Sequence, residues 1–149
     1  LISSGKIHQA NEGCACTMNS ILKQFIKHLM VGNNEVVLLD MEAGVEHFGR
    51  GVDNSVDLIL MIVDPSFESL KLTKKIQQLG ESIGKTVFFV LNKVNGQILP
   101  TMLESIDDQS KVLAVISEDT EIARKGLLGN ELMMEIPEIH TLARKILKQ

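Results

Sequence analysis

The 149-residue sequence contains no Trp or Tyr and only two Cys, and its longest apolar run, Leu58–Val63, is far too short to cross a bilayer. Two cysteines that are one residue apart cannot form a disulfide framework, which favours a reducing compartment. The N-terminus lacks the pattern of a signal peptide. The net charge is −4 with both signs interspersed, so the sequence has no pattern typical of a nucleic-acid-binding surface or a polybasic membrane patch. We therefore expect a cytoplasmic protein with no nucleic-acid or membrane partner.

The composition is that of a globular protein with an aliphatic core. Hydrophobic residues make up 44% of the chain, which is long enough for one domain. Strand-like apolar runs occupy residues 35–40, 58–64, 86–92 and 112–116. These runs are almost continuously apolar, as in a parallel sheet that is buried on both faces.

Helical patterns surround these runs. The first begins near Thr17 or Met18 and ends at the glycine and asparagines of 32–34, and the second follows Ser66 as its N-cap. Further helices are predicted at 98–106, 119–125 and 136–147. The alternation predicts one α/β domain over 1–149, with a three-layer, mostly parallel sheet flanked by helices. Ligands bind at the carboxyl ends of such strands, where Asp40, Asp64, Asn92 and Ser117 occur.

Asp40 and Gly44 form an Asp-x-x-x-Gly pattern after the first run. A carboxylate at this place can hold a water bound to Mg²⁺, and a glycine lets the backbone N–H approach a terminal phosphate. The pattern therefore favours a nucleotide-hydrolysis switch. The alternative is an acidic residue that only caps the loop after a strand.

Asn92 and Lys93 end the third run. In nucleotide-binding proteins with a phosphate loop, an Asn-Lys pair at this place reads the base through the amide, and the lysine stem packs along the nucleotide. GTPases with this pattern have an Asp where this chain has Asn95, so ATP is favoured over GTP. The alternative is that Asn92 only starts a turn before Gly96.

A phosphate loop of the form Gly-x-x-x-x-Gly-Lys-[Ser/Thr] is absent from this sequence. Ser4, Gly5 and Lys6 resemble its end, but Ile7 stands where the hydroxyl ligand of Mg²⁺ is needed. We therefore reject this segment as a phosphate loop.

Cys14 and Cys16 lie just before the first helix. A helix N-terminus lowers the pKa of thiols and favours metal binding, and sulfur ligands suit Zn²⁺, Cu(I), iron–sulfur clusters or Ni²⁺. A closed tetrahedral site needs four ligands, so either His8 or His47 contributes or two chains pool their cysteines. The alternative is a pair of thiols with no ligand.

Together, residues 13–16 and 40–51 resemble the CooC-type ATPases, accessory proteins for nickel insertion into carbon monoxide dehydrogenase within the MinD/ParA group of P-loop ATPases. The resemblance continues through 63–65, 92–93 and 116–119, and so covers nearly the whole chain. The switch segment is specific, whereas the later pieces are shared with the wider group.

The resemblance implies roles for single residues. Asp40 would be the switch carboxylate near Mg²⁺ and the attacking water, and Gly44 would approach the γ-phosphate of ATP. Asn92 with Lys93 would contact adenine, and Ser117 with Glu118 would flank the base. Cys14 and Cys16 would bind Ni or Zn at the interface of a homodimer, whose partner is carbon monoxide dehydrogenase or a related nickel enzyme.

The family also has a phosphate loop and its strand upstream, which this sequence does not contain. We therefore expect a P-loop NTPase-like fold that is incomplete at the N-terminus, and negligible ATP hydrolysis by this chain alone. Two alternatives remain. One is a non-catalytic metal-binding and dimerisation remnant, and the other is a MinD/ParA-type ATPase that positions partners.

Overall fold

The computed structural model describes residues 16–33, 35–41, 45, 48 and 55–148. The chain divides into two compact units, Leu1–Asp57 and Leu58–Gln149. In the first unit, α1 spans Cys16–His28 and carries Lys27 and His28 in its last turn, where cations interact favourably with the helix dipole. The predicted first helix is confirmed, although it ends before the glycine at 32.

The strand predicted at 35–40 is wrong. Residues 35–41 have no regular secondary structure, and the side chains of Val36, Val37 and Leu38 are 58%, 44% and 86% exposed. Apolar, β-branched residues make a strand only where a neighbouring strand supplies hydrogen-bond partners for the backbone. Within the described part of the chain, no strand pairs with this segment.

The second unit is built on a parallel sheet of three strands in the order β1-β2-β3. They are β1 Leu58–Val63, β2 Thr86–Val94 and β3 Val112–Ser117. The register pairs Leu58 with Thr86 and Val63 with Leu91. This arrangement confirms the predicted α/β class and is consistent with a P-loop NTPase-like core.

Helices connect and flank the strands. They are α3 Phe67–Ser82, α4 Leu99–Glu104, α5 Thr120–Leu128 and α6 Pro137–Ile146, with the short 3₁₀ helix η2 Gln109–Lys111 before β3. Ser66 caps α3 as predicted, and the Asp119 carboxylate accepts from the backbone N–H groups of Glu121 and Ile122 at the start of α5. None of the described helices is long and apolar enough to cross a membrane.

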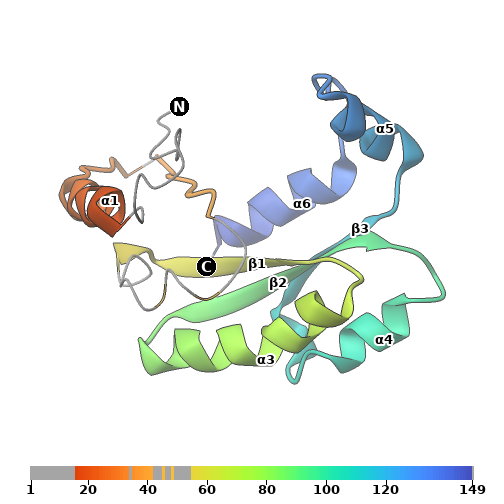
Figure 1. The fold of residues 1–149 in the computed structure, drawn as a ribbon, viewed down its shortest axis with the longest axis horizontal. Coiled ribbons are helices and arrows are strands. Elements are labelled where there is room, and N and C mark those ends of the chain that lie inside the picture. Colours follow the sequence, from red (N-terminus) through yellow and green to blue (C-terminus); the bar gives the residue numbers. More distant parts are fainter. Residues whose placement is uncertain (1–15, 34, 42–44, 46–47, 49–54, 149) are drawn as a thin grey trace. The chain divides into compact units, whose positions relative to one another are not determined.

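The sheet is covered on both faces, with α3 and α4 on one side and α6 on the other (Figure 1). Phe88 and Val90 of β2 form a buried cluster with Leu142 of α6. Since alternate residues of a strand point to opposite faces, Val87 and Phe89 face the other layer, where Gly80 of α3 packs against Val87. The predicted three-layer arrangement of this unit is therefore confirmed.

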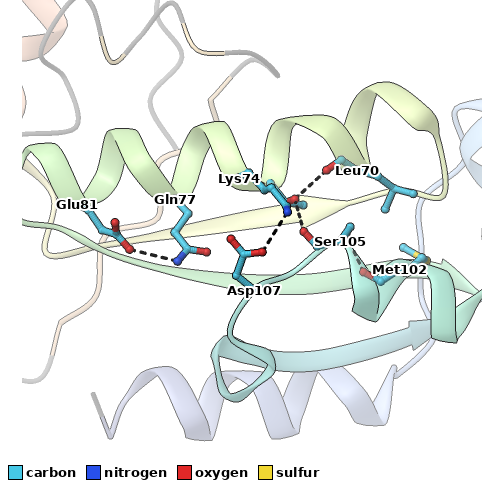
Figure 2. A network of polar contacts seen from close by, with 8 residues as sticks. Leu70, Lys74, Gln77, Glu81, Met102, Ser105 and Asp107 are labelled. Carbon is cyan, nitrogen blue, oxygen red and sulfur yellow. Dashed lines mark hydrogen bonds and ion pairs between the residues drawn. The ribbon is translucent and has the colours of Figure 1, made fainter.

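A polar network ties α3 to the segment after α4 (Figure 2). The hydroxyl of Thr73, which is 1% exposed, lies 2.7 Å from the carbonyl oxygen of Leu70 and 2.8 Å from that of Ser105. Lys74 Nζ forms an ion pair with Asp107 at 3.2 Å nearby. The network joins the middle of α3 to the segment that follows α4.

Candidate nucleotide-binding edge of the sheet

The carboxyl ends of β1 and β2 bring three polar residues together. Because Val63 pairs with Leu91, the next residues, Asp64 and Asn92, lie side by side. The Asn92 Nδ2 donates to Asp64 Oδ1 at 2.9 Å, and Lys93 Nζ donates to Asp64 Oδ2 at 2.5 Å. Each carboxylate oxygen of Asp64 therefore holds one side chain of the predicted base-reading pair.

The backbone of Asp64 is itself fixed by the start of α3. Its N–H donates to Ser69 Oγ at 3.1 Å, and its carbonyl accepts from the N–H of Ser66 at 2.8 Å. Ser66 in turn accepts from the N–H of Ser69 as the helix N-cap. Asp64 thus belongs to a hydrogen-bonded turn between β1 and α3, which fixes the position of its backbone.

A β-bulge shapes the end of β2. Leu91 pairs with Val115 and Val94 pairs with Ser117, so three steps along β2 match two along β3. The extra residue falls at Asn92 or Lys93, and Lys93 has a φ of 55°, in the left-handed region. A side chain there costs on the order of 1 kcal/mol, and bulges commonly re-aim side chains beside functional sites.

Ser117 and Glu118 lie against this bulge. Ser117 ends β3 opposite Val94, and the Glu118 N–H donates to the carbonyl of Val94 at 2.9 Å. The side chains of both residues are exposed. The structure thus places all four residues predicted to surround the base, Asn92, Lys93, Ser117 and Glu118, at one edge of the sheet.

The electrostatics of this edge are those of a solvent-accessible site. The side chain of Lys93 is 61% exposed and that of Asp64 is 40% exposed. Water screens such a pair, whose contribution to stability is about 0–1 kcal/mol. Asn92 is half-buried. The contacts of Asp64 therefore serve to orient Asn92 and Lys93 more than to stabilise the fold.

The remaining predicted site residues belong to the first unit. Asp40 is exposed and lies in the irregular segment 35–41, and Cys16 is the first residue of α1. Gly44 and Cys14 lie outside the described residues. Among the residues that the structure describes, no group of three or more His, Cys, Asp or Glu side chains could hold a metal ion.

Asp64 is the residue of this edge to which sequence reasoning gave no role. The sequence placed it only among the polar residues that follow the strands and within the family-like segment 63–65. Its partners, Asn92 and Lys93, lie 28 and 29 positions away in the chain. The parallel register that joins them became visible only in the folded structure.

Comparisons with known proteins point to nucleotide binding. The chain is 45% identical over 148 residues to an uncharacterised ATP-binding protein of Methanocaldococcus jannaschii. The aligned region covers 99% of this chain and 59% of that protein. A second uncharacterised ATP-binding protein of the same organism is 33% identical over 91% of this chain and 54% of its own length. The carbon monoxide dehydrogenase accessory protein CooC of Rhodospirillum rubrum is 32% identical over 87% of this chain and 49% of its own.

These relatives support a CooC-like ATP-binding family for the chain. The chain spans about half the length of the curated relatives it matches. No protein-family model matches the sequence.

Proposed function

We propose that this chain is part of an ATP-dependent metallochaperone for nickel insertion into carbon monoxide dehydrogenase, and that it binds the adenine of ATP at the edge of the sheet. The observation that carries the proposal is the bulge at Asn92 and Lys93 beside Ser117 and Glu118. The similarity to CooC and to ATP-binding proteins supports it. We expect the protein to act in the cytoplasm.

The chemistry of this edge suits a purine base. The Asn92 amide offers a donor and an acceptor at the carboxyl end of a parallel strand, where ligands bind in α/β sheets. The aliphatic stem of Lys93 can cover the base or ribose while its ammonium stays paired with Asp64. The loop at 117–118 would flank the base.

Asp40 and Gly44 are proposed as the hydrolysis switch. The carboxylate of Asp40 is exposed, and carboxylate oxygens are ligands that Mg²⁺ accepts. When bound, Mg²⁺ would neutralise charge on the phosphates. Asp40 would orient the Mg²⁺-bound water, and the backbone of Gly44 would donate to the γ-phosphate.

Cys14 and Cys16 are proposed to carry the metal as cargo. Cys16 begins α1, and Cys14 precedes it by two positions in the sequence; a helix N-terminus favours thiolates. Two chains of a homodimer would pool their cysteines into one Ni²⁺ or Zn²⁺ site. We expect about half a metal ion per chain in the wild type. Metal content that is unchanged in Cys14→Ser and Cys16→Ser would refute this assignment.

Calorimetry with Mg-ATP and Mg-ADP tests the nucleotide proposal. We expect Asn92→Ala to weaken binding by about 10- to 100-fold, because it removes hydrogen bonds worth roughly 1.5–3 kcal/mol. Asn130→Ala, at an exposed position beyond α5, is the matched control and should bind as the wild type does. Equal affinities of the Asn92→Ala variant and the wild type would contradict the proposal.

A non-catalytic metal-binding and dimerisation module is the second candidate. Such a module would hold metal but give no heat with either nucleotide, so the same titrations separate the two functions. A MinD/ParA-type partner-positioning ATPase is less favoured, since α6 has Arg144 and Lys145 but no aromatic side chain.

A further inference from the structure

The contact between Asp64 and Asn92 gives the Asn92 amide a defined orientation. An ionised carboxylate only accepts hydrogen bonds, so it binds the NH₂ side of the amide and not the carbonyl side. The Asn92 Nδ2 faces Asp64 Oδ1 at 2.9 Å accordingly. None of the described residues donates a hydrogen bond to Asn92 Oδ1. The amide therefore presents its carbonyl oxygen away from Asp64.

A fixed carbonyl acceptor discriminates between purines. Adenine carries an amino group at position 6, which donates, whereas guanine and hypoxanthine carry an oxygen there, which accepts. An amide that is free to rotate by half a turn can satisfy either base. An amide whose NH₂ is held by a carboxylate turns its carbonyl oxygen away from that carboxylate, where a 6-amino group can donate to it, whereas a 6-oxo group would face it as a second acceptor.

We propose that Asp64 is the residue that sets base selectivity, by holding the Asn92 amide so that its carbonyl accepts from a 6-amino purine and by anchoring Lys93 in the bulge. Asp64 acts through Asn92 and Lys93 and does not itself touch the nucleotide. This inference rests on the proposed adenine site.

Three features indicate that the contact is built for positioning. Both oxygens of Asp64 are used, one for each residue of the pair. The Asp64 backbone is held by Ser66 and Ser69 at the start of α3. Lys93 adopts a left-handed φ of 55°, a strained conformation that surrounding contacts must maintain. The ion pair between Asp64 and Lys93 is largely exposed and therefore contributes little to the stability of the fold.

The test compares ADP with inosine diphosphate, which has an oxygen in place of the 6-amino group, a proton on N1 of the base, and the same phosphates. We expect the wild-type chain to prefer ADP by about tenfold or more, as for the loss of one hydrogen bond of about 1.4 kcal/mol. In Asp64→Asn the preference should fall to about threefold or less, because the new amide can donate as well as accept and lets Asn92 rotate. Asp57→Asn, at the exposed opposite end of β1, is the matched control and should keep the preference.

The ratio of the two affinities separates positioning from a general structural effect. If Asp64→Asn weakens both nucleotides equally, the proposal is wrong even though the residue matters. Ser69→Ala removes a support of the Asp64 backbone and should lower the preference less than Asp64→Asn does. This second variant keeps the test valid if Asp64→Asn fails to fold by circular dichroism.

A measurement without nucleotide distinguishes this inference from the proposed function. In ¹⁵N-resolved NMR spectra, we expect the Asn92 side-chain NH₂ to show slow exchange with water, and Asp64→Asn to speed that exchange by tenfold or more. A wild-type chain that binds no ADP would overturn the proposed function while this spectrum still decides the orientation. Unchanged exchange in Asp64→Asn would overturn the positioning role.

Discussion

Replacing Thr73 by Val tests the polar network that joins α3 to the segment after α4. The substitution keeps the shape of a buried side chain but removes its hydroxyl, which contacts the carbonyl oxygens of Leu70 and Ser105 at 2.7 and 2.8 Å. The Leu70 contact lies within α3, whereas the Ser105 contact joins α3 to the end of α4. We expect the loss of the second contact to dominate.

The magnitude follows from burial. Thr73 is 1% exposed and Ser105 is half-buried, so water can replace the lost hydrogen bond only in part. A net hydrogen bond contributes about 1 kcal/mol, and a partly buried carbonyl left without its partner adds about 1–3 kcal/mol. Burying a methyl group in place of the hydroxyl returns roughly 1 kcal/mol. The expected destabilisation of Thr73→Val is therefore about 1–3 kcal/mol.

The matched control is Thr141→Val in α6. Thr141 also directs its hydroxyl at a carbonyl of its own helix, that of Pro137 at 3.3 Å, but it is exposed. Thr and Val have similar helix propensities, so this change should stay within about 0.5 kcal/mol. The chain has no Trp or Tyr, and urea unfolding is therefore best followed by circular dichroism.

Each kilocalorie should lower the melting temperature by roughly 2–4 °C in a chain of this size. Thr73→Val and Thr141→Val should have the same dependence of the unfolding free energy on urea but different unfolding midpoints. If the two midpoints coincide within error, the contact with Ser105 contributes nothing, and the account of the network is wrong.

Two further substitutions have outcomes fixed by local geometry. A Cβ on Gly80 would lie 2.4 Å from Val87 Cγ2, so Gly80→Ala should destabilise the fold by about 1 kcal/mol or more in urea unfolding. Gly126 has open space around it, so Gly126→Ala should stabilise the fold by about 0.5–1 kcal/mol in the same assay. Equal changes in unfolding free energy for the two variants would contradict the close packing of Gly80 against Val87. Hydrogen bonds from Ser110 lower the pKa of Asp108 below its ordinary 3.8, so any stabilisation is complete above pH 3.8 and is lost as the pH falls through the lower folded value. NMR titration should give a midpoint below 3.8 that rises in Ser110→Ala, and an unchanged midpoint would refute this cause.

Elements whose signals are local could be predicted from the sequence. The predicted N-cap Ser66 marks a helix start that the structure confirms, and the helices predicted from 119 and 136 begin at Thr120 and Pro137, because helix starts depend on residues only a few positions away. The strands β1, β2 and β3 also agree within two residues at their ends. Their continuous apolar runs require burial on both faces, and α3 and α6 provide it.

The segment 35–40 shows where this reasoning fails. Its residues have the same apolar, β-branched character as β1, yet Leu38 is 86% exposed and the segment has no regular structure. Propensity describes how well a residue suits a pleated surface, but a strand exists only when another strand pairs with it. The sequence of the segment contains no information about that pairing.

The candidate site also contains residues that a short sequence pattern predicts and one whose role depends on strand pairing. Asn92 and Lys93 were recognisable because they are adjacent and end an apolar run, so a short pattern describes them. The role of Asp64 depends instead on which strand neighbours β2 and in what register. A shift of β1 by one residue would place Val63 or Pro65 beside Asn92 and turn alternate side chains to the other face. The orientation of the Asn92 amide, and with it the proposed choice between purines, is therefore a property of the sheet and not of the motif.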